Sequence, residues 1–177
     1  MKKFLALIIS AIVLTVNLAG CGTAVQLNQS VEDYKFKEPI SSLVKAFKDK
    51  KYIEDKSTVV EMTPVTQENN KGDEKEYGGY LEIGAVEGYR FTTTYNESTI
   101  NLELYRYNTD KLDSTAKNII NSVKKDGKFK LENSSDAVDA YLSKDETFLM
   151  IYQDNSTDEK NTNRKKKVIS FFEDYKK

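Results

Sequence analysis

The amino-acid sequence predicts a single α+β domain over residues 38–177, in which a mostly antiparallel sheet packs against about three helices. Apolar residues recur three and four positions apart in three segments, which is typical of one buried helix face. Between these segments the apolar residues alternate with polar ones or form short continuous runs, which is typical of strands. The resulting order of helix, strands, helix, strands and helix favours a sheet that is covered on one face.

The first helix is predicted to begin at Pro39, because proline fits the first turn of a helix. Its buried face carries four apolar residues, which are Ile40, Leu43, Val44 and Phe47. A short strand is expected at residues 58–62, and Pro64 stops its continuation. The charged, glycine-containing segment 66–79 is expected to be an exposed loop.

The middle of the chain predicts a β-hairpin made of strands 89–95 and 99–107. Before it, the alternation of apolar and polar residues at 81–85 indicates another strand, and residues 87–88 indicate a turn. If Tyr95 pairs with Ser98, the apolar residues of the hairpin lie opposite one another. The expected pairs are then Phe91 with Leu102, Tyr89 with Leu104, Thr93 with Ile100 and, on the other face, Arg90 with Glu103. Shifting the register by one residue would set apolar residues against threonine and arginine, so the first register is predicted.

The two faces of this hairpin are expected to differ in burial. On the apolar face, Phe91→Ala is expected to cost about 3 to 5 kcal/mol of unfolding free energy. On the other face, Arg90→Ala is expected to cost under about 1 kcal/mol, as for an exposed ion pair. Tyr105 and Tyr107 share that second face, where they form either a binding patch or aromatics covered by another strand or by the first helix.

The second half of the domain predicts two more helices with short strands between them. Asp110 is expected to cap the first of these helices, and Gly127 stands where a glycine ends a helix. The apolar stripe of this helix consists of Leu112, Ala116, Ile119, Ile120 and Val123. Strands are expected at residues 129–131, 137–142 and 147–152, the last of them central because it is continuously apolar.

The last helix is predicted after a polar loop at residues 153–163. Its buried side consists of Val168, Ile169, Phe172 and Tyr175. The basic run from Arg164 to Lys167 stands at its head. This run either contacts anionic lipid headgroups or forms a solvated helix face.

The first 21 residues precede this domain and have a different character. A cationic start, Met1-Lys2-Lys3, is followed by an apolar run at residues 4–16, which is the anatomy of a secretory signal. The run is shorter than the roughly 20 apolar residues of a transmembrane helix. It is followed by Leu18-Ala19-Gly20-Cys21, which resembles the lipobox of bacterial lipoproteins. In that family the cysteine thiol carries diacylglycerol and the preceding peptide bond is cleaved.

The resemblance implies that residues 1–20 are a signal peptide and that Cys21 carries a lipid. It also implies anchoring at the extracytoplasmic face of the cell membrane. Because residues 22–37 are polar and lack periodicity, residues 21–37 are expected to comprise the lipidated cysteine and a flexible tether. The richness in Lys, Asn, Ile and Tyr also resembles small lipoproteins of low-GC Gram-positive bacteria.

Composition argues against several classes of function. The full chain has a formal charge of −1, and removal of Lys2 and Lys3 with the signal leaves −3, which argues against a nucleic-acid partner. The chain has no histidine, and Cys21 is its only cysteine. The mature protein therefore lacks the commonest general base and a free thiolate, and no cofactor or metal site is expected.

One local pattern imitates a catalytic site. Ser114-Thr115-Ala116-Lys117 fits the S-x-x-K pattern of penicillin-binding proteins and serine β-lactamases, in which lysine helps to activate the serine. The accompanying motifs of those enzymes are missing, and Ser122 and Lys125 repeat the same spacing. A solvated helix turn is therefore expected.

A second pattern imitates a metal site. Asp154, Ser156 and Asp158 have the spacing of the first ligands in a calcium-binding EF-hand loop. Glu159 stands where that loop requires glycine, and Lys165 stands where it requires glutamate. A solvated acidic loop is therefore expected.

These observations predict a non-enzymatic binding or accessory module at the cell envelope, with an envelope protein as its partner. An immunity, exclusion or structural lipoprotein is the alternative, and a small serine- or carboxylate-dependent hydrolase is a further one. Three surfaces are candidates for binding, namely residues 68–77, the face of Tyr105 and Tyr107, and the basic run from Arg164 to Lys167.

Overall fold

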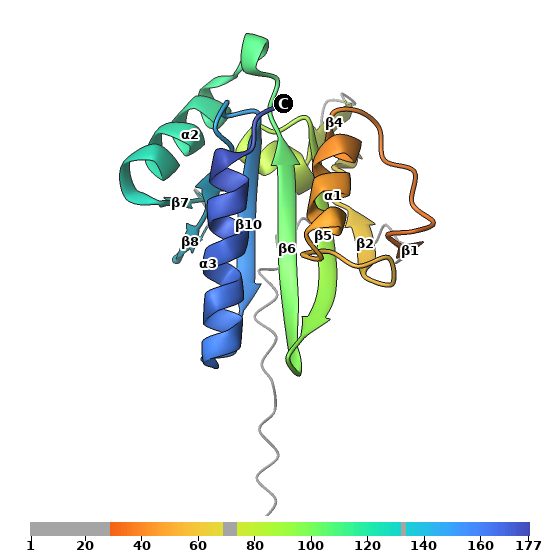
Figure 1. The fold of residues 1–177 in the computed structure, drawn as a ribbon. Helices are drawn as coiled ribbons and strands as arrows, with labels where there is room; N and C mark the ends of the chain where they lie inside the picture. The colour runs from red at the N-terminus through yellow and green to blue at the C-terminus, as the bar shows by residue number, and fades with distance from the viewer. Residues whose placement is uncertain (1–28, 69–73, 132–133) are drawn as a thin grey trace, which may run out of the picture.

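The computed structural model describes residues 29–68, 74–131 and 134–177, which form one α+β domain, as predicted (Figure 1). Among these residues, six strands make the main sheet in the order β1-β2-β5-β6-β10-β9, and all neighbours are antiparallel. The strands are β1 (Gln29–Ser30), β2 (Thr58–Glu61), β5 (Glu87–Tyr95), β6 (Ser98–Arg106), β9 (Tyr141–Leu142) and β10 (Phe148–Asp154). The described residues also form two hairpins, β3 (Val65–Glu68) with β4 (Glu74–Tyr77) and β7 (Lys128–Lys130) with β8 (Ala137–Asp139).

Helices cover both faces of the main sheet. α1 (Ile40–Asp49) and α3 (Glu159–Asp174) lie on one face, in front of the sheet in Figure 1, and share an apolar core with it. α2 (Ser114–Asp126) packs against the other face, in a second apolar cluster that includes Tyr105, Tyr107 and Leu149. The prediction that one face is covered is therefore wrong, because both faces carry large apolar side chains.

The hairpin of β5 and β6 has the predicted register. The pairs include Tyr95 with Ser98, Phe91 with Leu102, Tyr89 with Leu104, Thr93 with Ile100 and Arg90 with Glu103. β6 also pairs with β10 and β5 with β2, so the hairpin forms the middle of the sheet. β10 lies between β6 and β9, which confirms it as an interior strand. The strand predicted at residues 137–142 is divided into β8 and β9, with Ala140 between them.

Around Glu103 and Tyr105 the second face of the hairpin is buried, contrary to the prediction that the pair of Arg90 with Glu103 is exposed. Glu103 is 5% exposed, and its carboxylate accepts hydrogen bonds from Arg90 Nε at 2.8 Å and from the Tyr105 hydroxyl at 2.7 Å. Tyr105 and Tyr107 are covered by α2, so they are not a binding patch. Arg90→Ala would leave a buried carboxylate without its cation, so the expected cost rises to about 2 kcal/mol or more.

Tyr105 and Tyr107 offer a matched pair of substitutions on this face. Burial raises the pKa of Tyr105 well above its usual range, so its phenol stays protonated and donates to Glu103. Tyr105→Phe removes this hydrogen bond to a buried carboxylate and is expected to lower the free energy of unfolding by about 1 to 3 kcal/mol. The buried Tyr107 hydroxyl finds no hydrogen-bond partner in the described ranges. Tyr107→Phe is therefore expected to be neutral or to stabilise by up to about 1 kcal/mol.

Urea titration of the two variants beside the unchanged protein measures both effects. The hydroxyl is the only group removed in either case, so the difference between the variants isolates the bond to Glu103. A larger loss for Tyr107→Phe than for Tyr105→Phe would contradict this assignment of the hydrogen bonds.

Three expectations between β2 and β5 are wrong. Segment 66–79, predicted as a loop, contains most of β3 and all of β4, while residues 69–73 lie outside the described part of the chain. Of residues 81–85, predicted as a strand, the first three belong to the 3-10 turn η1 (Gly79–Ile83), which is capped by Gly84 with a φ of 69°. Residues 87–88, predicted as a turn, begin β5. Alternation over five residues does not distinguish a strand from one tight helical turn.

The later helices begin at residues other than those predicted. Asp113 caps α2, because its carboxylate accepts a hydrogen bond at 2.7 Å from an N–H of the first turn. Asp110 lies before it, in the 3-10 turn η2 (Thr109–Lys111). Asp158 caps α3 in the same way, so the helix begins within the predicted loop 153–163. Gly127 ends α2 with a φ of 66°, as predicted.

The domain begins earlier than the predicted boundary at residue 38. β1 pairs with β2, and the residues that follow, 31–36, form a segment that we call the N-terminal strap. Val31 in this strap is 3% exposed, and Tyr34 and Phe36 pack against the main core. Residues 29–37 are therefore part of the domain and not of a tether. Cys21 and the rest of residues 1–28 lie outside the described residues.

Candidate functional site

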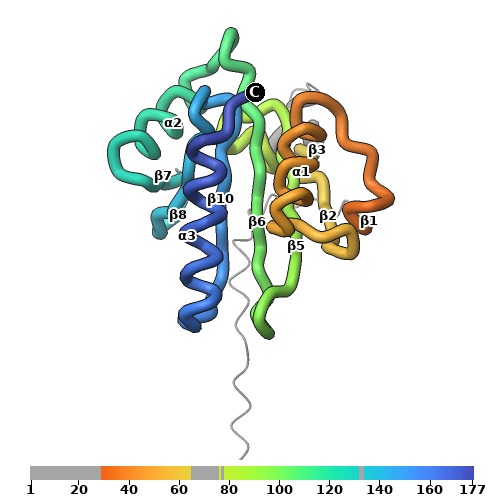
Figure 2. The backbone as a smooth tube through the Cα atoms, in the orientation of Figure 1, coloured from red at the N-terminus to blue at the C-terminus, as the bar shows by residue number. Residues whose placement is uncertain are grey.

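A groove of about 550 Å³ lies between the N-terminal strap and α1. In Figure 2 the strap is the orange arc that leads from β1 to the start of α1. The groove is lined by Val31, Glu32, Tyr34, Lys35 and Phe36 of the strap and by Ser41, Val44, Lys45, Lys48 and Asp49 of α1. This volume lies within the range of about 300 to 1,000 Å³ that is usual for binding pockets.

Aromatic packing fixes the strap over the sheet. The ring centroid of Tyr34 lies 4.6 Å from that of Phe36 and 5.7 Å from that of Tyr89, and Phe36 stacks on Phe91 at 5.8 Å. The Tyr34 hydroxyl donates a hydrogen bond to Glu61 at 2.7 Å. Burial, together with this bond to Glu61, raises the pKa of Tyr34 to about 12, so the phenol is a donor at neutral pH. The strap is thus a fixed wall of the groove.

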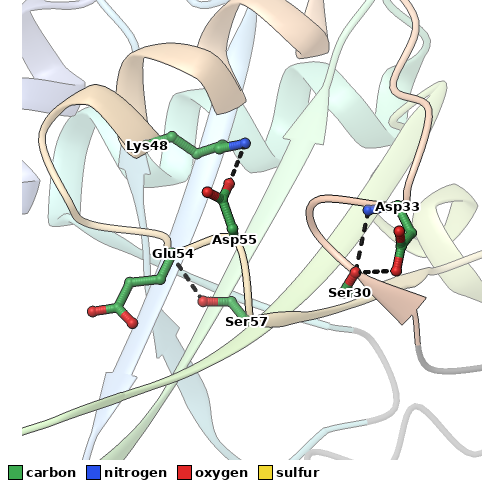
Figure 3. A network of polar contacts seen from close by, with 6 residues as sticks. All are labelled: Ser30, Asp33, Lys48, Glu54, Asp55 and Ser57. Atoms are coloured by element: carbon green, nitrogen blue, oxygen red, sulfur yellow. Dashed lines mark hydrogen bonds and ion pairs between the residues drawn. The ribbon is translucent and has the colours of Figure 1, made fainter.

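Polar contacts fix the first residues of the strap and the end of α1 (Figure 3). The Ser30 hydroxyl donates to the Asp33 carboxylate, and the Asp33 N–H donates back to Ser30 Oγ at 3.2 Å. Lys48 of α1 forms an ion pair with Asp55. The N–H of Val31 donates to the carbonyl of Ser57 at 2.8 Å, which ties the strap to the turn before β2.

The groove combines an apolar floor with a charged rim of mixed sign. Lys35 and Lys45 are exposed, and neither forms an ion pair within the described ranges. Glu32 and Asp49 are likewise exposed and without an ion pair there. The arrangement can accept an apolar side chain and charged neighbours of either sign. It offers no activated nucleophile.

The candidate hydrolase residues do not come together in this groove. Ser114 and Lys117 are exposed on the first turn of α2, which packs on the opposite face of the sheet. Of the carboxylates near the strap, Glu61 accepts the hydrogen bond from Tyr34, and Glu87 forms an ion pair with Arg106. Neither arrangement resembles a nucleophile beside a general base.

The oxygen ligands of the imitated EF-hand loop are used by the fold. Asp154 accepts hydrogen bonds from the Ser98 hydroxyl at 2.6 Å and from the Asn161 amide at 2.9 Å. Ser156 donates its backbone N–H to the same carboxylate, and Asp158 caps α3. Across the residues that the structure describes, no group of three or more His, Cys, Asp and Glu could hold a metal ion.

The basic run on α3 is divided between core and surface. Arg164 is buried at 8% exposure, while Lys166 and Lys167 are exposed. The Arg164 guanidinium donates to the carbonyl of Tyr52 at 2.9 Å and lies 4.7 Å from the ring centroid of Tyr95. Arg164 therefore supports the fold and is not available to a lipid headgroup, so the predicted four-residue basic surface is wrong.

Sequence reasoning missed the groove because it assigned the strap to a tether. The available signal was the presence of Val31, Tyr34 and Phe36 within a polar stretch, where a tether requires no apolar residue. Of the predicted surface at residues 68–77, the structure shows the strand backbones of β3 and β4.

None of the helices in the described ranges is long and apolar enough to cross a membrane. Searches against protein-family models, curated proteins and solved structures give no match to this chain.

Proposed function

We propose that the chain is a lipid-anchored, extracytoplasmic lipoprotein whose domain is a non-enzymatic binding module for a protein of the cell envelope. The groove between the strap and α1 is the proposed contact. The observation that carries this proposal is the position of the groove, because it is formed by the segment that follows the proposed lipidation site. Val31, the first lining residue, comes shortly after Cys21 in the chain.

The groove supports binding more than catalysis. It has the size of a binding site, an apolar floor and fixed walls, which are the features of a preformed recognition surface. A small hydrolase has less support, because Ser114 and Lys117 are exposed and far from this hollow in the fold. Binding requires only the surface that the groove supplies.

Cys21→Ala is expected to abolish lipid attachment, since a thiol alone can form the thioether. The variant should accumulate as an unprocessed precursor or leave the membrane fraction, and it should carry no fatty-acid label after metabolic labelling. Thr23→Ala is the matched control, because it changes a neighbouring residue and keeps the thiol. Fatty-acid label that persists on Cys21→Ala would contradict the lipoprotein assignment.

A further inference from the structure

We propose that the groove binds a juxtamembrane segment of an integral membrane protein that lies in the same bilayer as the lipid anchor. This inference rests on the proposed lipidation of Cys21. It goes further by naming the class of partner and the part of that partner which enters the groove.

The reach of the anchor limits where the groove can be. Eight Cα-to-Cα steps separate Cys21 from Gln29, the first residue of β1. A chain extends by at most about 3.6 Å per residue, so β1 lies within about 29 Å of the lipid-bearing residue. The contacts of Val31 with the core and with Ser57 hold β1 in the domain, so the chain after β1 adds no slack.

The groove lies on the side of the domain to which this short connection is joined. β1 is the first strand at one edge of the sheet, and the strap that follows it forms one wall of the groove. Strands lie about 4.8 Å apart, so the β9 edge lies about 24 Å farther across the sheet. A juxtamembrane segment occupies the layer next to the bilayer, where the groove has a high effective concentration. A soluble or wall-attached partner is not confined to that layer.

The side chains that line the groove indicate which kind of peptide segment can bind there. Tyr34, Phe36 and Val44 supply apolar and aromatic contacts for at least one apolar side chain. Lys35 and Lys45, which form no ion pair with any residue that the structure describes, line the same hollow as Glu32 and Asp49, so the rim has no single sign. An anionic lipid headgroup would meet carboxylates as well as lysines, whereas a peptide can present charges of both signs around an apolar residue. The geometry therefore favours a peptide segment over a lipid.

A photo-crosslinking amino acid at position 45 of the full lipidated chain, introduced in intact cells, tests this directly. We expect an adduct in which the crosslinked peptide of the other protein, identified by mass spectrometry, adjoins a membrane-spanning segment of that protein. The same amino acid at position 167, an exposed lysine of α3, is the matched control and should give at most a tenth of that adduct. Lys35→Glu, a change on the exposed rim, should lower the yield at least threefold without changing the melting temperature, whereas Lys167→Glu should leave the yield unchanged.

Lengthening the connection supplies a second, independent measurement. Inserting about 24 Gly and Ser residues after Gly22 raises the number of chain steps about fourfold, so the yield should fall about eightfold by the −3/2 power of length. An unchanged yield with the long connection would overturn the inference. So would adducts formed only with soluble or wall-attached proteins or only with lipid, or the absence of any adduct at position 45.

The anchor is checked in the same cells, so that the two proposals fail separately. Fatty-acid label on Cys21 without a membrane-protein adduct overturns the inference about the groove and leaves the lipoprotein assignment intact. Absence of the label overturns the proposed lipid anchor, and with it the argument from reach.

Discussion

Replacing Phe91 with alanine is expected to lower the free energy of unfolding by about 3 to 5 kcal/mol, because it empties the centre of the main core. Phe91 is completely buried on β5, between its partners Val59 on β2 and Leu102 on β6. The ring of Phe36 stacks on it from the strap. Truncation therefore removes a buried aromatic and leaves a cavity beneath α1. A denaturant titration with linear extrapolation measures the loss.

Thr94→Ala is the matched control for this prediction. Thr94 lies on the same strand as Phe91 but is exposed, so its truncation should change the free energy of unfolding by no more than about 0.5 kcal/mol. Losses of equal size for the two variants would show that Phe91 does not face the core. Phe91→Ala also removes the aromatic contact with Phe36 of the strap, which adds to its loss of unfolding free energy.

The register of the central hairpin could be predicted because its sequence pattern is unambiguous. Each strand of the hairpin is nine residues long, and its apolar residues repeat with a period of two. A slip by one residue would turn all of them to the other face. The pattern does not reveal that part of the second face, around Glu103 and Tyr105, is also buried. Tyr105 and Glu103 have polar groups, and only their contact with each other and with Arg90 allows them to be buried.

The regions that could not be predicted are short and depend on contacts from distant parts of the chain. β1 has only two residues, and its pairing with β2 joins segments that are far apart in the sequence. The strap follows the same rule, because Tyr34 and Phe36 are fixed by Tyr89 and Phe91. The local sequence of residues 22–37 shows only a polar stretch, because the contact partners Tyr89 and Phe91 lie far away in the sequence. The groove was missed for that reason.

The start of α3 illustrates a different limit. Its first two turns are polar, with Asn161 and Arg164 on the buried side, so the apolar spacing that predicts a helix begins only at Val168. The Asn161 side chain accepts a hydrogen bond from the Asn96 amide at 2.8 Å and donates one to Asp154 at 2.9 Å. These bonds replace apolar packing at the tip of the β5–β6 hairpin. Polar residues thus hold this end of the helix in place.

Arg164→Ala is expected to lower the free energy of unfolding by about 3 kcal/mol, although the sequence places this residue in a basic run expected to lie on the surface. Its guanidinium donates to the carbonyls of Lys51 at 3.3 Å and Tyr52 at 2.9 Å and to the Tyr152 hydroxyl at 3.2 Å. It also lies over the ring of Tyr95. The substitution would leave these acceptors without their donor and remove the link between α3 and the turn after α1.

Two further variants separate the shape of the Arg164 side chain from its charge. Arg164→Lys keeps the charge, but an ammonium group lacks the planar fork that reaches several acceptors at once, so it should recover less than half of the loss. Lys166→Ala removes an exposed charge from the same run and should cost no more than about 0.5 kcal/mol. Thermal and urea unfolding of the three variants rank these effects. Equal stability of Arg164→Ala and Lys166→Ala would mean that the basic run is solvated throughout. Full stability of Arg164→Lys would mean that only the charge of the side chain matters. Because the Arg164 guanidinium is buried and reaches several acceptors, we expect a large loss of stability for Arg164→Ala, a partial recovery for Arg164→Lys and almost no loss for Lys166→Ala.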